Sequence, residues 1–200
     1  MIKILFFIET LSGGGAEKVL QNLVNNMDNE KFDITVQTVW KEDPDGLLNK
    51  NIKYKYIYPC YSKLNNYKYR LSVLLKTIYP RYIKDSYDIE VAYLECGATK
   101  VISTSTNKNA KKVAWVHCDL SKKISNINEF KRKSVSWYKK FDKVVCVSRD
   151  VEKSFKSIYG NEFDTEVIYN AIDDYSIIEK ADETVDDYFF DEKSPTIVSV

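Results

Sequence analysis

The chain has 200 residues, which is enough for one full domain and a little more. Apolar residues make up 44% of it, so it can bury a sizeable core. Its formal net charge of +1 excludes a strong overall excess of either sign, so only the distribution of charge can indicate a partner. The first apolar run, residues 2–8, is too short to span a membrane, and no basic segment with a cleavage site precedes it.

That first run consists of β-forming residues and is typical of a strand buried on both faces of a parallel sheet. Gly13, Gly14 and Gly15 follow, and a helical pattern extends from residue 15 to about 28. Free backbone N–H groups and the positive end of a helix dipole then lie at the mouth of the sheet. This arrangement predicts a place to hold an anion such as phosphate.

Strands and helices alternate through the rest of the chain. Further strands are predicted at 33–39, 52–57, 88–94, 112–117, 143–147 and 166–169. Further helices are predicted at 67–84, from residue 97, at 129–140 and at 148–158. The helix at 67–84 is expected to carry Leu71, Leu74, Leu75 and Ile78 on one face. The alternation predicts an α/β fold, a Rossmann-like parallel sheet of about six to seven strands with helices on both faces.

The C-terminal part differs in composition. Residues 1–174 read as one domain, whereas residues 175–200 are acidic and then end inside an apolar run that resembles a new strand. We therefore expect an interdomain linker and the first strand of a second, truncated domain.

The four cysteines are Cys60, Cys96, Cys118 and Cys146, and their spacing matches neither a zinc site nor a redox pair. The last three fall at or near predicted strand ends, which indicates buried, reduced thiols. This pattern predicts a reducing, cytoplasmic location.

The glycine turn fits two common phosphate-binding motifs poorly. A dinucleotide fingerprint needs spaced glycines and an acid at the end of the second strand, but here the glycines are consecutive and Glu42 and Asp43 come late. The phosphate-loop spacing before Lys18 is also wrong. A plain tight turn, a non-catalytic sugar-binding or scaffold module, and an NAD(P)-dependent oxidoreductase or epimerase remain as alternatives.

Five segments in order make a resemblance that spans nearly the whole chain. They are residues 13–20 (GGGAEKVL), 115–120 (WVHCDL), 141–148 (FDKVVCVS), 167–173 (VIYNAID) and 197–200 (IVSV). Together they resemble glycosyltransferase family 4, whose members are retaining enzymes with two Rossmann-like domains, the GT-B fold. Residues 93–100 (YLECGATK) look like those of members that build capsular or other surface polysaccharides.

The resemblance implies the N-terminal, acceptor-side half of such an enzyme. A nucleotide-sugar donor would be bound mostly by a second domain, and a saccharide or lipid-linked acceptor mostly by this one. The sugar would be transferred with retention of its anomeric configuration, with no metal and no other cofactor. The 200-residue chain alone is expected to fold but not to transfer sugar.

Two features are candidate donor contacts. Gly13, Gly14 and Gly15 would face the interdomain cleft near the donor phosphates and the acceptor. His117, the only histidine, follows a predicted strand at the edge where open α/β sheets bind ligands. By resemblance His117 contacts the donor sugar, and we do not assign it as a general base.

Four further residues are candidate substrate contacts. Glu95 and Thr99 follow the predicted strand at 88–94, and Asp119 lies just beyond His117, so these three are candidates for the acceptor. Arg149 follows the expected N-cap Ser148, and the resemblance implies that it reaches an acceptor anion or a donor phosphate.

Residues 50–84 contain nine Lys or Arg, no acid, and eight of the 15 tyrosines. One interpretation is a solvated helix face with tyrosines packed beneath it. The other is a peripheral membrane surface on the inner face of a membrane, where basic residues meet anionic lipid and tyrosines lie at the interface. No RNA-binding signature accompanies the segment, so nucleic acid is not an expected partner.

Overall fold

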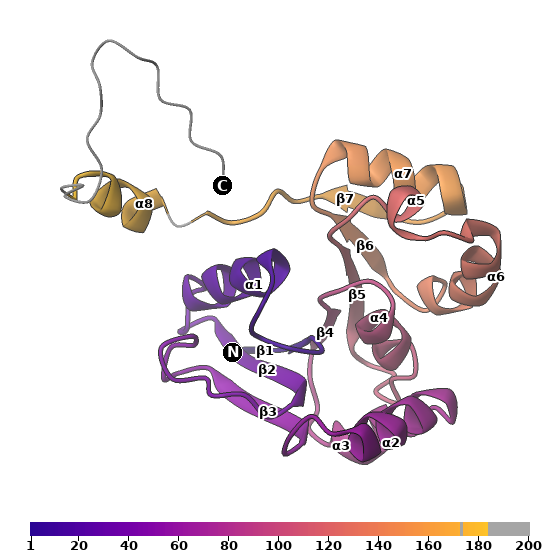
Figure 1. Ribbon diagram of the computed structural model, residues 1–200, viewed down its shortest axis with the longest axis horizontal. Helices are drawn as coiled ribbons and strands as arrows, with labels where there is room; N and C mark the ends of the chain where they lie inside the picture. Colours follow the sequence, from indigo (N-terminus) through magenta and orange to yellow (C-terminus); the bar gives the residue numbers. More distant parts are fainter. Residues whose placement is uncertain (173, 184–200) are drawn as a thin grey trace, which may run out of the picture.

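The computed structural model in Figure 1 describes residues 1–172 and 174–183, which fold around one parallel sheet. The strands are β1 (Ile2–Phe7), β2 (Phe32–Trp40), β3 (Lys53–Tyr58), β4 (Ile89–Ala92), β5 (Lys111–Val116), β6 (Lys143–Cys146) and β7 (Thr165–Val167). The helices are α1 (Gly15–Asn25), α2 (Lys63–Leu74), α3 (Ile78–Tyr82), α4 (Gly97–Ile102), α5 (Leu120–Lys123), α6 (Ile127–Tyr138), α7 (Arg149–Tyr159) and α8 (Asp174–Ala181).

The sheet has seven strands in the order β3-β2-β1-β4-β5-β6-β7, and every neighbouring pair is parallel. The predicted Rossmann-like α/β fold is therefore confirmed. The strand order reverses between β1 and β4, which makes the carboxyl ends of these two strands the topological switch point. Open α/β sheets bind their ligands in the crevice at this point.

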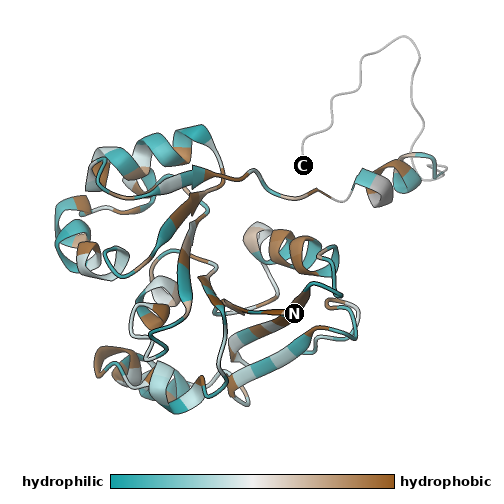
Figure 2. Ribbon diagram, turned by 180° about the vertical axis from the view of Figure 1, so that it is seen from behind, coloured by the Kyte–Doolittle hydropathy of each residue, from teal (hydrophilic) through white to brown (hydrophobic). Residues whose placement is uncertain are grey.

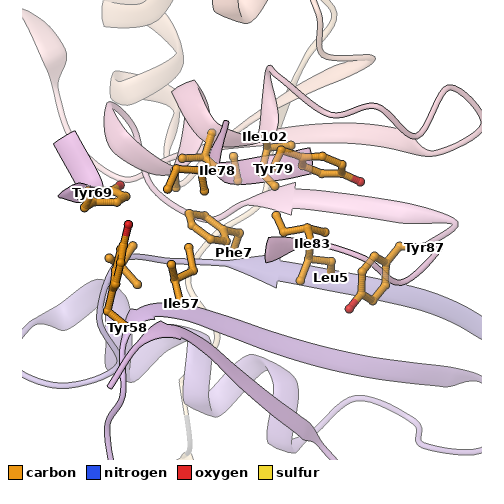
Figure 3. Close-up of a cluster of buried hydrophobic side chains, with 14 residues drawn as sticks. Leu5, Phe7, Ile57, Tyr58, Tyr69, Ile78, Tyr79, Ile83, Tyr87 and Ile102 are labelled. Atoms are coloured by element: carbon orange, nitrogen blue, oxygen red, sulfur yellow. The ribbon is translucent and has the colours of Figure 1, made fainter. Parts of the chain in front are cut away.

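Alternate residues of β1 face two different layers. Ile4, Phe6 and Ile8 pack with Leu20 and Val24 of α1 on one face of the sheet. Leu5 and Phe7 face the other way and pack with side chains of α2, α3 and α4, as Figure 3 shows. From Ile4 to Phe7 the strand is buried on both faces, so these four residues are all apolar rather than alternating.

The second half of the sheet is covered on the α2–α4 face by α6 and α7. Ala114 of β5 and Cys146 of β6 pack with Tyr138 of α6 and with Phe155 and Tyr159 of α7. Ser148 caps α7 as predicted, because its hydroxyl accepts the Val151 amide at 3.2 Å. This packing fixes the loops that follow β4, β5 and β6 at one edge.

The prediction of one helix at 67–84 is wrong. The chain forms two helices there, since Ser62 caps α2 by accepting the Asn65 amide at 3.1 Å and Lys76 adopts a φ of 57° between α2 and α3. The expected apolar face is split as well, with Ile78 buried and Leu71, Leu74 and Leu75 exposed.

After β7 the chain leaves the sheet, and Ala171, Ile172 and the first residue of α8, Asp174, line a pocket together with Asn22 and Leu23 of α1 (Figure 1). The expected strand at 195–200 lies outside the described residues. Within the described ranges, none of the helices is both long and apolar enough to cross a membrane.

Candidate functional site

The switch point brings the predicted site residues to one edge of the sheet. The glycine turn follows β1, the loop with Glu95 follows β4, the loop with His117 and Asp119 follows β5, and Arg149 follows β6. The carboxyl ends of parallel strands share an edge, so these four segments line up along it in the order glycine turn, Glu95 loop, His117 loop and Arg149.

The glycine turn leads directly into α1. Gly13 has a φ of 100°, a conformation that side-chain-bearing residues rarely adopt, and Gly14 is the N-cap of α1 with no side-chain cap hydrogen bond. The first backbone amide bonded within the helix is that of Lys18, which donates to the Gly14 carbonyl at 3.2 Å. A Cβ at Gly13 or Gly15 would meet nothing within 4 Å, so the helix N-terminus opens onto free space. Its amides and dipole can hold an anion there.

Glu17 lies over this turn and adds a negative charge to it. Its carboxylate accepts the Thr10 hydroxyl at 3.0 Å and occupies the place that a Cβ at Gly14 would take. A side chain at Gly14 would therefore displace Glu17, which is flexible enough to move.

Glu95 holds the loop after β5 in place. Its side chain is 4% exposed and accepts hydrogen bonds from the His117 amide at 3.1 Å, the Cys118 thiol at 2.9 Å and the Lys123 ammonium at 2.8 Å. Burial alone would raise the pKa of Glu95, but the hydrogen bonds from Cys118, Lys123 and the His117 amide together lower it. Glu95 is therefore ionised at neutral pH, and its three donors fix the backbone at His117.

His117 is half-buried in an aromatic cluster. Its ring centroid lies 4.6 Å from that of Tyr93 and 6.2 Å from that of Trp115. Burial lowers the pKa of His117 from 6.5 to about 4, against the opposing effects of the Glu95 and Glu17 carboxylates, so the imidazole is neutral at pH 7. A neutral ring can donate or accept a hydrogen bond but carries no charge.

Three buried polar atoms of this cluster lack a hydrogen-bond partner among the described residues. They are the His117 Nε2, the Trp115 Nε1 and the Tyr93 hydroxyl. Buried polar groups normally have hydrogen-bond partners, so these three atoms could form hydrogen bonds with a bound molecule that is rich in hydroxyl groups. Sequence reasoning missed Tyr93 and Trp115 because their roles depend on contact with His117 across two strands.

In contrast to the Nε2 of His117, the side-chain oxygens of Thr99 and Asp119 already form hydrogen bonds within the protein. Thr99 is fully buried, and its hydroxyl donates to the Leu94 carbonyl at 2.9 Å, which closes the turn into α4. Asp119 caps α5 by accepting the Ser121 amide at 3.0 Å and also accepts the Ser154 hydroxyl of α7. Hydrogen bonds from Ser121 and Ser154 lower the pKa of Asp119, so it stays ionised. Both residues have structural partners here, and their acceptor roles remain predictions.

Arg149 lies exposed at the first position of α7, with no ion pair among the described residues. Asp150 and Glu152 share its helical turn and complement the dipole, so Arg149 is free to meet an anion.

A groove of about 810 Å³ lies next to this edge, between α2, the end of β1 and α4. Glu9, two residues after the end of β1, lines the groove and accepts the Tyr69 hydroxyl at 2.8 Å. A Cβ at Gly97 would come within 2.5 Å of the Glu9 carboxylate, so a larger residue at position 97 would clash with Glu9 in this position. Lys63, Arg70 and Lys100 also line the groove.

Sequence reasoning missed this groove, although one signal was available. Glu9 immediately follows the first strand, and polar residues at the carboxyl ends of central strands are candidate ligands by the switch-point rule. Tyr69 and Lys100 come from distant segments, and their approach to Glu9 could not be seen.

The fold is a Rossmann-like domain, and its candidate ligand site lies at the topological switch point. The sequence profile of Glycosyltransferase Family 4 matches residues 13–175, so the chain belongs to that family. A search of curated proteins found no match.

Solved structures of Anabaena Alr3699/HepE are similar in fold. The one in complex with UDP and glucose has a TM-score of 0.59 at 20% identity, and the one in complex with UDP-glucose has a TM-score of 0.60 at 21% identity. In both cases the match covers 86% of this chain but 45% of the other, so the chain spans less than half the length of those proteins.

Proposed function

We propose that this chain is the N-terminal, acceptor-side half of a retaining GT-B glycosyltransferase. It would move a sugar from a nucleotide-sugar donor to a saccharide or lipid-linked acceptor during surface polysaccharide assembly in the cytoplasm. The family match across residues 13–175 carries the proposal. The UDP-glucose bound by the similar HepE supports a nucleotide sugar as donor.

The donor would meet this domain at the glycine turn and at His117. The free amides of the first turn of α1 and the exposed Arg149 would stabilise the donor phosphates, so that no metal ion is needed. The unpaired Nε2 of neutral His117 would hydrogen-bond a hydroxyl of the donor sugar. Glu95 would act by positioning His117, since it holds the His117 amide.

The acceptor would bind in the groove beside α2. Its walls combine apolar Leu71 and Leu74 with basic Arg70 and Lys100, which suits an acceptor that has both an apolar and an anionic part. Most donor-nucleotide contacts would come from a second domain outside this chain, consistent with the 45% coverage of HepE.

The test compares the 200-residue chain with a longer protein that includes the following domain. We expect the longer protein to release UDP from UDP-glucose in the presence of acceptor and EDTA, and the chain alone to release none. His117→Ala should lower kcat of the longer protein by about 10²-fold or more, because a contact that strengthens in the transition state is lost. Lys100→Ala should instead raise the KM for the acceptor.

The same experiment separates the alternatives. A scaffold module would show no sugar transfer in the longer protein with any nucleotide sugar offered. In a separate titration, an oxidoreductase or epimerase would show quenching of its tryptophan fluorescence by added NAD(P)H. Either result would overturn the proposal.

A further inference from the structure

Helix α2 exposes an apolar stripe, three of whose residues, Tyr67, Leu71 and Leu74, also line the groove beside the helix. Leu64, Tyr67, Leu71, Leu74 and the C-cap Leu75 follow one another at spacings of three and four residues or lie side by side at the helix end, so they share one face. Their exposure lies between 41% and 67%, and Tyr69 is the only residue of α2 that is buried. Figure 2 shows the hydrophobic residues of this helix at the edge of the molecule. Contiguous apolar side chains exposed on one helix face are typical of an interaction site.

Positive charge borders the stripe on both sides. By helical spacing, Lys63 and Arg70 lie along one edge and Lys68 lies along the other. None of these three side chains, nor Lys76 beyond the helix end, has an ion-pair partner among residues 1–172 and 174–183. Residues 50–84 contain no acid at all.

The apolar stripe and the basic residues on both sides of it indicate which kind of partner fits α2. A surface that fits it must be apolar along its centre and negative on both sides, as at the boundary between headgroups and acyl chains of an anionic bilayer. Tyr67 suits the same boundary because its ring is apolar and its hydroxyl is polar. Lys63, Arg70, Leu71 and Leu74 also line the groove, so the stripe and the groove share one side of α2.

We propose that α2 lies in the headgroup layer of an anionic phospholipid membrane, with its apolar stripe toward the acyl chains. Lys63, Lys68 and Arg70 then meet lipid phosphates, and the groove beside α2 opens to that layer. The inference stands on α2 alone and does not require sugar transfer. Its failure would leave the proposed function untouched, and the converse also holds.

The test is co-flotation of the purified chain with vesicles. We expect binding to vesicles of phosphatidylcholine mixed with phosphatidylglycerol, little binding to phosphatidylcholine alone, and weaker binding as salt rises. Lys63→Gln with Arg70→Gln should weaken binding about thirtyfold, from roughly 1 kcal/mol for each cation near the surface. Leu71→Ser with Leu74→Ser should abolish detectable binding without changing the net charge.

The matched control is Lys131→Gln with Arg132→Gln on α6, which removes the same charge from an exposed helix elsewhere. It should change binding by less than about twofold, because cations beyond a Debye length from the membrane are screened. Each variant should give the circular dichroism spectrum of the wild type, which shows that it is folded.

Four results would overturn the inference. They are equal binding to both vesicle types, an equal loss in the α6 control, saturation of the site by soluble glycerol phosphate, and a dimer that Leu71→Ser with Leu74→Ser converts to monomer. The last would assign the stripe to a second copy of the chain.

Discussion

Helices α7 and α2 each carry a row of apolar side chains, but the structure uses these two rows in opposite ways. In α7, Val151, Phe155, Ile158 and Tyr159 are buried against β5, β6 and α6. In α2 the comparable stripe faces outward. The periodicity of a helix defines which residues share a face, but it does not say what covers that face.

Polar groups follow the same division. On the closed side, made of α5, α6, α7 and the Glu95–His117 loop, Glu95 has three donors and Asp119 ties α5 to α7. On the open side, made of α2 and its groove, Lys63 and Arg70 have no ion-pair partner within the described part of the chain. The closed side is built to hold its shape, and the open side is free to meet a partner.

The largest effect is expected from the centre of the closed side. Phe155→Ala removes a fully buried ring whose centroid lies 4.7 Å from that of Tyr159 and 5.0 Å from that of Tyr138. We expect the free energy of unfolding in urea to fall by about 3–5 kcal/mol, from lost burial and the cavity left behind. A loss below about 1 kcal/mol would show that this core is loosely packed.

The pH dependence of stability should reveal the buried His117. Its pKa is about 4 in the folded state and 6.5 ordinarily, so between these values the unfolded chain binds the extra proton. Stability should therefore fall as pH drops from 6.5 toward 4, by up to about 3 kcal/mol. In His117→Gln the urea midpoint should change less with pH between 6.5 and 4.5 than in the wild type. This interval lies above the range in which most carboxylates titrate. An unchanged slope in this variant would contradict the burial of a neutral imidazole.

Glu95→Gln tests the donors that hold the His117 loop. The amide nitrogen of glutamine must face at least one donor, so we expect about 2 kcal/mol lower stability at pH 7. The folded pKa of Glu95 is lowered, so its contribution is present above about 4.5 and is lost as pH falls through the folded value. Wild type and variant should converge in acid.

Glu129→Gln on α6 is the matched control, because Glu129 forms an exposed ion pair with Lys133. It should cost less than about 0.5 kcal/mol. A control loss as large as that of Glu95→Gln would mean that charge alone, and not the buried hydrogen bonds, causes the effect.

Much of the fold could be predicted from the sequence because short local patterns determine many of its helices and strands. The apolar run at β1 and the cap at Ser148 each specify their element directly. The break between α2 and α3 was missed, although Ser62 is a good N-cap and Pro80 fits the first turn of a new helix. The site was only partly visible, since Lys123 reaches Glu95 across 28 residues and Tyr69 reaches Glu9 across 60. Such contacts depend on the topology rather than on spacing.

The smallest effect on stability is expected on the open side, and it is the sharpest test of the comparison. Leu71→Ala with Leu74→Ala removes as much apolar volume as a core substitution would, but both side chains are already in contact with solvent. Alanine is also the better helix former, which offsets the little packing that is lost. We therefore expect the free energy of unfolding to change by less than about 0.5 kcal/mol, against several kcal/mol for Phe155→Ala. If the isolated chain instead lost several kcal/mol of unfolding free energy, as a core substitution does, α2 would pack its stripe inward in solution. The stripes of α2 and α7 would then be used alike.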